Sequence, residues 1–297
     1  MRIAALDIGG TSIKSGIWTG GAAEEVREYA TNAKKGGPYV VERAKEILHG
    51  YGSFDAIGIS TAGQVDPVLG CIRYANENIP DYTGMRLRDI LEHEFSVPVA
   101  VENDVNAAAI GEGRFGAGKD SKDFLCLTYG TGVGGAVILE RELYHGCAFS
   151  AGEFGGIVVH PEDVREGDPF SGCYEKYAST TALVDRAKRL DESLTNGREI
   201  FQRIGEPKVK AVVDGWIDEI VHGLVSLIHI FNPSCVVLGG GVMAQPYILD
   251  EVGEKCLKRI MSSFRDVTIR QAALGNQAGL LGAASLGAKA LEKRARE

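Results

Sequence analysis

Two segments of the sequence share one pattern: an apolar strand, a glycine-rich turn that carries a threonine, and a second strand. The first is LDIGGTSIKSGIW at 6–18, and the second is LTYGTGVGGAVIL at 127–139. Short matches of this kind also arise by chance, but each copy opens one half of the chain, which favours an internal repeat. Because domains average about 150 residues, the length of 297 residues also favours two domains.

Strand-like and helix-like segments alternate along the rest of the chain. Apolar runs predict strands at 55–60, 98–102 and 235–238. Helical periodicity predicts helices at 38–50, 84–95, 104–113, 181–194, 208–231 and 277–297. This alternation is typical of an α/β fold with mixed sheets flanked by helices.

Composition excludes several classes of protein. The formal net charge is −8, and Lys and Arg are spread along the chain, so we expect no nucleic-acid partner. No apolar run approaches the about 18 residues of a membrane span, and a strand pattern begins at once, so we expect no membrane partner and no signal peptide. The six cysteines include no C-x-x-C pair, which favours reduced thiols and a cytoplasmic location.

Three glycine turns each follow a strand: Gly9-Gly10-Thr11, Gly130-Thr131-Gly132 and Gly239-Gly240-Gly241. Glycine lets the backbone approach a phosphate closely, and its N–H groups can converge on anionic oxygens. The alternative is that these are ordinary turns that need a positive φ. No Walker or Rossmann glycine motif is present, so a nucleotide would be bound by hairpins.

Three carboxylates stand where chemistry is favoured. Asp104, after Asn103 in VAVENDVNAAAIGEG (99–113), ends a strand and opens a helix, where the helix dipole favours the ionised form. Such a carboxylate can accept the proton of an attacking hydroxyl, although a simple helix cap explains it equally well. Glu153 on a glycine-rich loop and Glu175 at a helix start could accept hydrogen bonds from a diol, or could be ordinary surface acids.

With these motifs in view, the chain resembles the ROK family (repressor, open reading frame, kinase) of bacterial sugar kinases over nearly its whole length. The matching segments are LDIGGTSIKSGI (6–17), GISTAGQVD (58–66), NENIPDYTGMRLRDIL (76–91), ENDVNAAAIGE (102–112), LTYGTGVGGAVI (127–138), AGEFGG (151–156), GCYEKYAS (172–179) and PSCVVLGGGV (233–242).

The resemblance implies two ribonuclease H-like (actin-like ATPase) domains: a small one of residues 1–103 plus 277–297, and a large one of 104–276 that bears a dimer surface. It implies ATP and Mg²⁺ as cofactors, a sugar substrate and a homodimer. Asp104 is the implied general base. The implied sugar-binding residues are Gly63, Asn78, Asn103, Asp104, Glu153 and Glu175. The implied nucleotide-binding residues are Asp7 (toward Mg²⁺), Gly9, Gly10, Thr11, Lys14, Gly130, Thr131, Gly132, Gly239, Gly240 and Gly241.

The sequence departs from the family at its zinc motif. Gly156 stands where many members have a zinc-binding histidine, and only Cys173 remains of three cysteine ligands. We therefore expect no structural zinc site and a resemblance to the zinc-less branch, which includes β-glucoside kinases. A substitute set of His160, Glu166, Asp168 and Cys173 stays open, although hard ligands around one thiolate are unlike a structural zinc site.

The sequence thus predicts an ATP-dependent sugar kinase that phosphorylates a hexose or hexoside hydroxyl, with the 6-hydroxyl of glucose or of a β-glucoside favoured. Two alternatives remain: a sugar-responsive ROK transcriptional regulator without its DNA-binding extension, and a non-catalytic actin-like ATP-binding module. The identity of the sugar is not encoded in these motifs.

Overall fold

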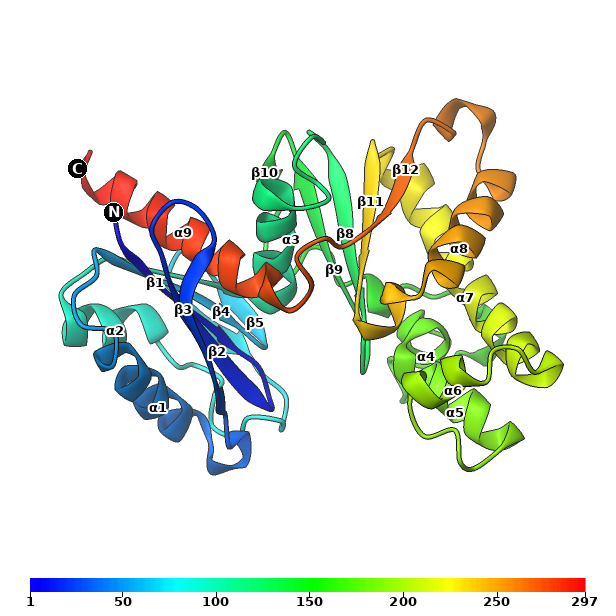
Figure 1. The fold of residues 1–297 in the computed structure, drawn as a ribbon, viewed down its shortest axis with the longest axis horizontal. Helices are drawn as coiled ribbons and strands as arrows, with labels where there is room; N and C mark the ends of the chain where they lie inside the picture. The colour runs from blue at the N-terminus through cyan, green and yellow to red at the C-terminus, as the bar shows by residue number, and fades with distance from the viewer. Residues whose placement is uncertain (297) are drawn as a thin grey trace. The chain divides into compact units, whose positions relative to one another are not determined.

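The computed structural model describes residues 1–296 and consists of two compact units (Figure 1). Unit 1 comprises Met1–Lys119, Leu143–Ala151 and the C-terminal segment from Asn276, and unit 2 comprises Asp120–Glu142 and Gly152–Gly275. Residues 104–119, which the sequence analysis assigned to the large domain, pack within unit 1. The division into a small and a large domain that the family resemblance implies stays a prediction.

Unit 1 is built on a mixed five-stranded sheet. Its strands are β1 (Ile3–Ile8), β2 (Ser12–Trp18), β3 (Ala23–Ala30), β4 (Ala56–Thr61) and β7 (Val99–Asn103). They lie side by side in the order β3-β2-β1-β4-β7. β5 (Gln64–Asp66) and β6 (Cys71–Tyr74) form a separate pair. Its helices are α1 (Gly37–His49), α2 (Leu87–Phe95), α3 (Asp104–Phe115) and α9 (Ala278–Arg294).

The two faces of this sheet are covered by different helices, because side chains alternate along a strand. Ala4, Leu6 and Ile8 of β1 share a buried cluster with apolar residues of α1 and α2. On the opposite face, α9 packs closely on the sheet through small residues. β1, β4 and β7 run parallel, so their carboxyl ends meet at one edge. Polar side chains at this edge form part of the candidate site.

Unit 2 repeats this sheet order. Its strands are β8 (Phe124–Tyr129), β9 (Val133–Leu139), β10 (Glu142–Leu143), β11 (Cys235–Gly239) and β12 (Thr268–Gln271). They lie side by side in the order β10-β9-β8-β11-β12. β8 pairs antiparallel with β9 and parallel with β11, as β1 does with β2 and β4. The two glycine-turn segments therefore occupy matching positions in two sheets, as an internal repeat predicts.

A large apolar core supports the helices of unit 2. These are α4 (Glu175–Ala178), α5 (Thr180–Leu190), α6 (Gly197–Gln202), α7 (Pro207–Phe231) and α8 (Pro246–Arg259). The short 3₁₀ helices of the chain are η1 (Ala33–Lys35), η2 (Phe154–Gly156), η3 (Pro161–Asp163), η4 (Gly241–Ala244), η5 (Ser262–Phe264) and η6 (Gly275–Gln277). α7 contributes many buried side chains to this core. One of them, Trp216, donates its indole N–H to the carbonyls of Ala178 and Ser179 at 3.0 Å.

The predicted elements are largely confirmed, including the α/β fold class, the two glycine hairpins and the long helix at 208–231, which ends at Phe231. The helix predicted at 84–95 begins only at Leu87, after a loop. β3 was not predicted from the sequence, because its side chains are mostly exposed and lack an alternating apolar face.

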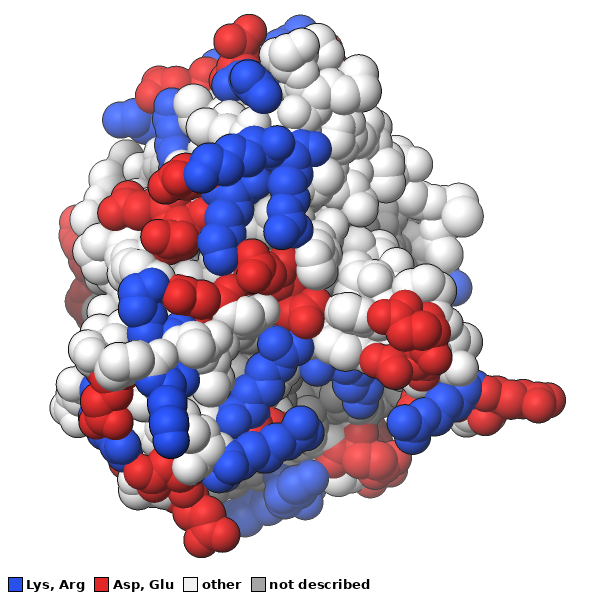
Figure 2. Space-filling model, turned by 90° about the vertical axis from the view of Figure 1, so that its right-hand side faces the viewer, with Lys and Arg blue, Asp and Glu red and all other residues white. Residues whose placement is uncertain are grey.

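The surface carries mixed charge. In Figure 2, Lys and Arg lie among Asp and Glu over the face in view. Lys210 pairs with Asp214 at 2.8 Å on α7, and Lys255 of α8 with Asp218 at 2.9 Å. Within residues 1–296, no helix is both long enough and apolar enough to cross a membrane.

Candidate active site

Polar side chains of unit 1 gather where the parallel strands β1, β4 and β7 end. Asp7 lies beside Ser60 in the β1–β4 register, and Thr61 lies beside Asn103 in the β4–β7 register. The Ser60 hydroxyl donates to Asp7 Oδ1 at 2.6 Å. In α/β sheets, ligands bind at the carboxyl ends of the strands, so this edge is a candidate site by topology.

Asn103 and Asp104 are joined at the start of α3. Asn103 is the N-cap, since its Oδ1 accepts the N–H groups of Val105 at 2.9 Å and Asn106 at 3.1 Å. Its Nδ2 donates to Gly63 O and to Asp104 Oδ1, both at 2.9 Å. Both amide hydrogens of Asn103 are therefore engaged within the chain, and the residue orients Asp104. Its predicted role as a sugar ligand stays a prediction.

Asp104 is the first residue of α3, and its Oδ1 also accepts the Val105 N–H at 2.9 Å. Burial raises the pKa of the Asp104 carboxyl to about 6; the Val105 N–H opposes this rise, and the negative charge of Asp7 adds to it. The sequence analysis expected the helix dipole to favour the ionised form, but burial outweighs it. Asp104 is thus a carboxylate that can exchange a proton near neutral pH.

Asp7 is a second carboxylate of this edge. Burial raises its pKa, opposed by the hydrogen bond from Ser60 and by the charge of Lys14. Lys14 lies opposite Asp7 in the β1–β2 register. A Cβ built on Gly279, in the first turn of α9, would lie 3.0 Å from the Asp7 carboxylate, so Asp7 stands at the positive end of that helix. The β1–β2 register thus brings together Asp7 and Lys14, both predicted to bind the nucleotide.

A buried pair of side chains next to Asn103 was not predicted from the sequence. Glu102 is 2% exposed, and its Oε2 lies 2.7 Å from Nε2 of His145, which belongs to the segment Leu143–Ala151 of unit 1. Its Oε1 accepts the Asn103 N–H at 2.8 Å and the Asn106 side-chain amide at 3.0 Å. Glu102 thus connects the segment before Glu153 to the start of α3. The sequence offered one signal for Glu102, which is its position directly before the predicted Asn103-Asp104 pair. It offered none for the partner His145, which is 43 residues away in the chain.

The first glycine turn is anchored from behind. Thr31 donates its hydroxyl to Gly9 O at 2.7 Å and its N–H to Thr11 O at 3.0 Å. Gly10 and Thr11 are exposed, and a Cβ added at Gly10 would meet no atom within 4 Å. The packing of the chain therefore does not require glycine at position 10, and the backbone of this turn is open to approach.

The other two sugar-site candidates of unit 1 differ. Gly63 has φ +99°, and a Cβ there would lie 2.8 Å from Tyr74 O, so its own backbone requires glycine. Its carbonyl accepts from Asn103, which brings it to the site. Asn78 lies exposed on the connection between β6 and α2, where its N–H donates to Asn76 Oδ1 at 3.0 Å.

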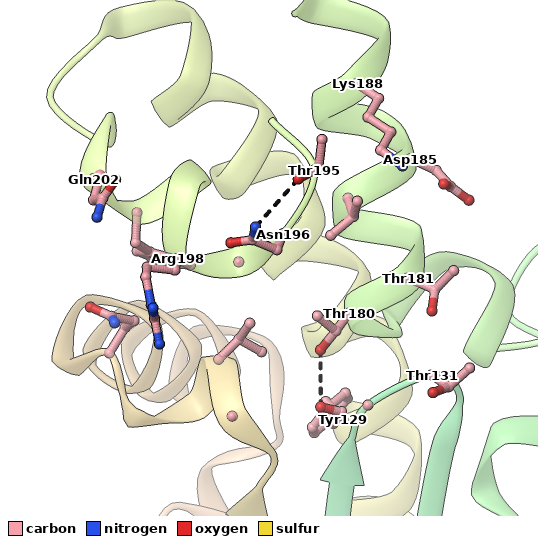
Figure 3. Close-up of a pocket in the computed structure, with 17 residues that line it drawn as sticks. Tyr129, Thr131, Thr180, Thr181, Asp185, Lys188, Thr195, Asn196, Arg198 and Gln202 are labelled. Atoms are coloured by element: carbon pink, nitrogen blue, oxygen red, sulfur yellow. Dashed lines mark hydrogen bonds between the residues drawn. The ribbon is translucent and has the colours of Figure 1, made fainter. Parts of the chain in front are cut away.

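Unit 2 contains a cavity of about 910 Å³ (Figure 3). Thr131, Thr180 and Thr181 lie along one side of it. On the other side are Asn196 and Arg198, from the start of α6. The lining combines hydroxyl and amide groups, two cations (Lys188 and Arg198) and one carboxylate (Asp185) with apolar side chains. This size and lining suit a small organic ligand with a polar, anionic portion.

The two predicted glycine turns of unit 2 meet at this cavity. Gly130 and Thr131 lie at the β8–β9 turn and Gly241 after β11, and all three line the cavity. Gly240 is required by the chain, because its φ is +111° and a Cβ would lie 2.2 Å from Tyr129 O. By contrast, a Cβ at Gly130 or Gly241 would meet nothing within 4 Å, as at Gly10.

Glu175 lies behind the β8–β9 turn. A Cβ on Gly132 would lie 2.6 Å from Glu175 Oε2, and one on Gly155 would lie 3.1 Å from it. The carboxylate therefore lies between the predicted phosphate turn and η2. Glu153 is exposed and immediately precedes η2.

The four residues left open as a metal set do not converge. Glu166 and Asp168 are exposed on the loop between η3 and α4. The Cys173 thiol is buried and donates to Gly156 O at 3.2 Å. His160 turns instead toward Glu162 and Glu219, each 2.8 Å from a ring nitrogen.

Comparison with known proteins matches this arrangement to one family. The family model described as "ROK family" matches residues 3–290. The chain is 35% identical to a beta-glucoside kinase of Listeria monocytogenes, over 95% of this chain and 96% of the relative.

Solved structures give the same result. A ROK hexokinase from Thermus thermophilus has a TM-score of 0.84 at 33% identity and covers 99% of this chain and 100% of its own. A ROK family glucokinase from Streptomyces griseus, solved in complex with glucose and AMPPNP, has a TM-score of 0.82 at 32% identity and covers 97% of this chain and 100% of its own.

The family model spans almost all of the chain, and these relatives are sugar kinases over their whole lengths. The two sheets of matching order are the two actin-like ATPase folds of such kinases. The chain therefore belongs to the ROK family and is a sugar kinase, a phosphotransferase.

Proposed function

We propose that the chain transfers the γ-phosphoryl group of ATP to a hydroxyl of a hexose or hexoside, the 6-hydroxyl of glucose or of a β-glucoside, with Asp104 as the general base. The observation that carries the proposal is the partly buried Asp104 carboxylate, held by Asn103 at the start of α3 with its pKa raised to about 6. A base with a pKa near the working pH is efficient, because it is ionised yet still able to take a proton.

The proton step follows from the hydrogen bonds of Asp104. The bonds from Asn103 Nδ2 and Val105 N–H both fall on Oδ1. We assign Oδ2 as the oxygen that accepts the proton of the sugar hydroxyl while that hydroxyl attacks phosphorus. Asn103 and the α3 backbone fix the carboxylate, which is the positioning that phosphoryl transfer requires.

The cavity of unit 2 is the proposed nucleotide site, with Thr131 and the Gly130 and Gly241 backbones beside it. The relative solved with AMPPNP supports a nucleoside triphosphate as donor. Mg²⁺ takes oxygen ligands, and the partly buried Asp7 carboxylate fits that preference; a bound Mg²⁺ would neutralise charge on the phosphates. Lys14, opposite Asp7, and the exposed Gly9-Gly10-Thr11 turn complete the proposed phosphate contacts.

For the acceptor sugar we propose the residues that the family resemblance implies: Gly63, Asn78, Asn103, Asp104, Glu153 and Glu175. The relatives named beta-glucoside kinase and glucokinase support glucose or a β-glucoside. The homodimer stays a proposal that rests on the family resemblance, and the cytoplasmic location stays one that rests on the pattern of the cysteines.

We expect kcat/KM for the sugar to fall about tenfold per pH unit below about pH 6. Asp104 accepts a proton only when ionised, and its pKa is raised to about 6, so activity is lost as the pH falls through that value. The measurement is initial-rate kinetics across the acidic range at saturating ATP, with the coupling enzymes in excess at every pH. A rate that stays constant through about pH 6 would contradict this assignment of the base.

The proposed function is tested by ADP release measured over a panel of hexoses, amino sugars and β-glucosides. We expect release to require one of these sugars, with glucose or a β-glucoside giving the highest kcat/KM. ADP release at the same rate with and without every sugar would mean hydrolysis of ATP in place of sugar phosphorylation. No ADP release with any sugar would support a non-catalytic ATP-binding module.

A further inference from the structure

We propose that His160, Glu219 and His222 form a binding site for a transition-metal cation, with Zn²⁺ as the best fit, on the surface of unit 2. His160 precedes η3, and the other two residues lie one turn apart on α7. Among residues 1–296 these are the three side chains whose His and carboxylate donor atoms all lie within 4.8 Å of one another. None of the three belongs to the proposed kinase site.

Two of the three distances between donor atoms are already near those that a metal requires, and the third is at most 4.8 Å. His160 Nε2 lies 2.8 Å from Glu219 Oε2, and His222 Nδ1 lies 3.3 Å from the same oxygen. With Zn–N and Zn–O bonds of about 2.0–2.1 Å, tetrahedral geometry separates ligand atoms by about 3.4 Å. A small side-chain adjustment therefore converts the hydrogen-bonded group into a coordination site.

Outer contacts hold the ligands in the orientation that metal binding needs. The other ring nitrogen of His160, Nδ1, lies 2.8 Å from Glu162, which reproduces the carboxylate–imidazole arrangement found behind many metal-bound histidines. Arg186 donates to Glu219 Oε1 at 3.0 Å and leaves Oε2 turned toward the two imidazoles. The His160 ring also packs against that of Tyr177, with centroids 4.1 Å apart and the ring planes tilted by 34°.

The composition of the site favours zinc over magnesium. Two imidazoles and one carboxylate are borderline ligands that suit Zn²⁺, whereas Mg²⁺ prefers oxygen and water. The His222 side chain is 41% exposed, so a cation can enter and a water molecule can complete the four ligands. A metal here would tie the segment between Glu153 and Glu175 to α7.

The test is zinc titration of the full chain after treatment with a chelator, followed by calorimetry and by thermal unfolding. The background is Cys147→Ser, because Cys147 is an exposed thiol that could bind zinc itself. We expect one saturable zinc per chain and a rise in Tm that Mg²⁺ does not reproduce.

Single substitutions separate this site from other zinc contacts. His222→Gln should abolish the saturable binding, and because this side chain is exposed the variant should still fold. Glu162→Gln should weaken affinity by about 10–100-fold, as loss of a carboxylate behind a metal-bound histidine does. His229→Gln is the matched control on the same helix, since its ring contacts Val225 O at 2.7 Å, and it should bind as the parent does.

The proposal fails if the parent takes up no saturable zinc, or if His222→Gln binds zinc with unchanged affinity and stoichiometry. Neither outcome depends on kinase activity, so the metal site and the proposed function are judged separately.

Discussion

Asp104→Asn lowers kcat by at least about 100-fold, the low end of the effect of a positioned general base. The substitution preserves shape, and an amide oxygen can still accept the bonds that Asn103 and Val105 donate to Oδ1. What is lost is the group that takes the proton. KM for ATP and for the sugar should therefore change little, and kcat and kcat/KM should fall together.

Steady-state kinetics of the purified variant check this result. Asp89→Asn is the matched control, because Asp89 is an exposed helix residue that pairs with Arg86 on α2, and its kcat should equal that of the parent. Turnover of Asp104→Asn close to that of the parent would remove Asp104 from the role of base.

The pH dependence of the Tm of Asp104→Asn shows independently that this variant is folded. Burial raises the pKa of Asp104 in the folded protein from 3.8 to about 6, so ionising this carboxyl destabilises the fold. The loss of folding free energy is on the order of 3 kcal/mol above about pH 6. It vanishes below about pH 4, where the carboxyl is protonated in both the folded and the unfolded state. Asparagine carries no charge, so the variant should unfold at a higher Tm than the parent near neutral pH, and this advantage should shrink as the pH falls.

Gly282→Ala destabilises the protein by about 4 kcal/mol or more, although alanine is the better helix former. Gly282 lies in α9, and a Cβ there would lie 1.7 Å from the carbonyl oxygen of Ala107 in α3. On the sheet side of α9, a Cβ on Gly58 of β4 would lie 1.8 Å from Ala283 O. The helix is in backbone contact on both sides, so it cannot move away from α3 to make room for a methyl group.

Denaturant and thermal unfolding measure the effect. Gly253→Ala is the control: it lies inside α8, a Cβ there meets nothing within 4 Å, and the change should be neutral or stabilising by up to about 1 kcal/mol. Because Asp104 opens α3, the kcat of any folded Gly282→Ala should fall as well. A Tm for Gly282→Ala equal to or above that of the parent would contradict the close packing.

The sequence predicted what depends on local pattern. Alternation and glycine turns identified both hairpins, and the strand-to-helix switch at Asn103 identified Asp104. The pairing of Glu102 with His145 and of His160 with Glu219 spans 43 and 59 residues, and no short-range periodicity reports contacts of that kind. The direction of the Asp104 pKa shift was also missed, because the helix dipole can be inferred from sequence position whereas burial cannot.

The residues that line the cavity of Figure 3 all belong to unit 2, while Asp104 and Asn103 belong to unit 1. On the proposed function, the residues around the nucleotide cavity and the residues that accept and orient the proton are thus separate sets of amino acids. Natural or laboratory selection can exchange one phosphoryl donor for another through changes around α5 and α6 and leave the proton-accepting apparatus untouched.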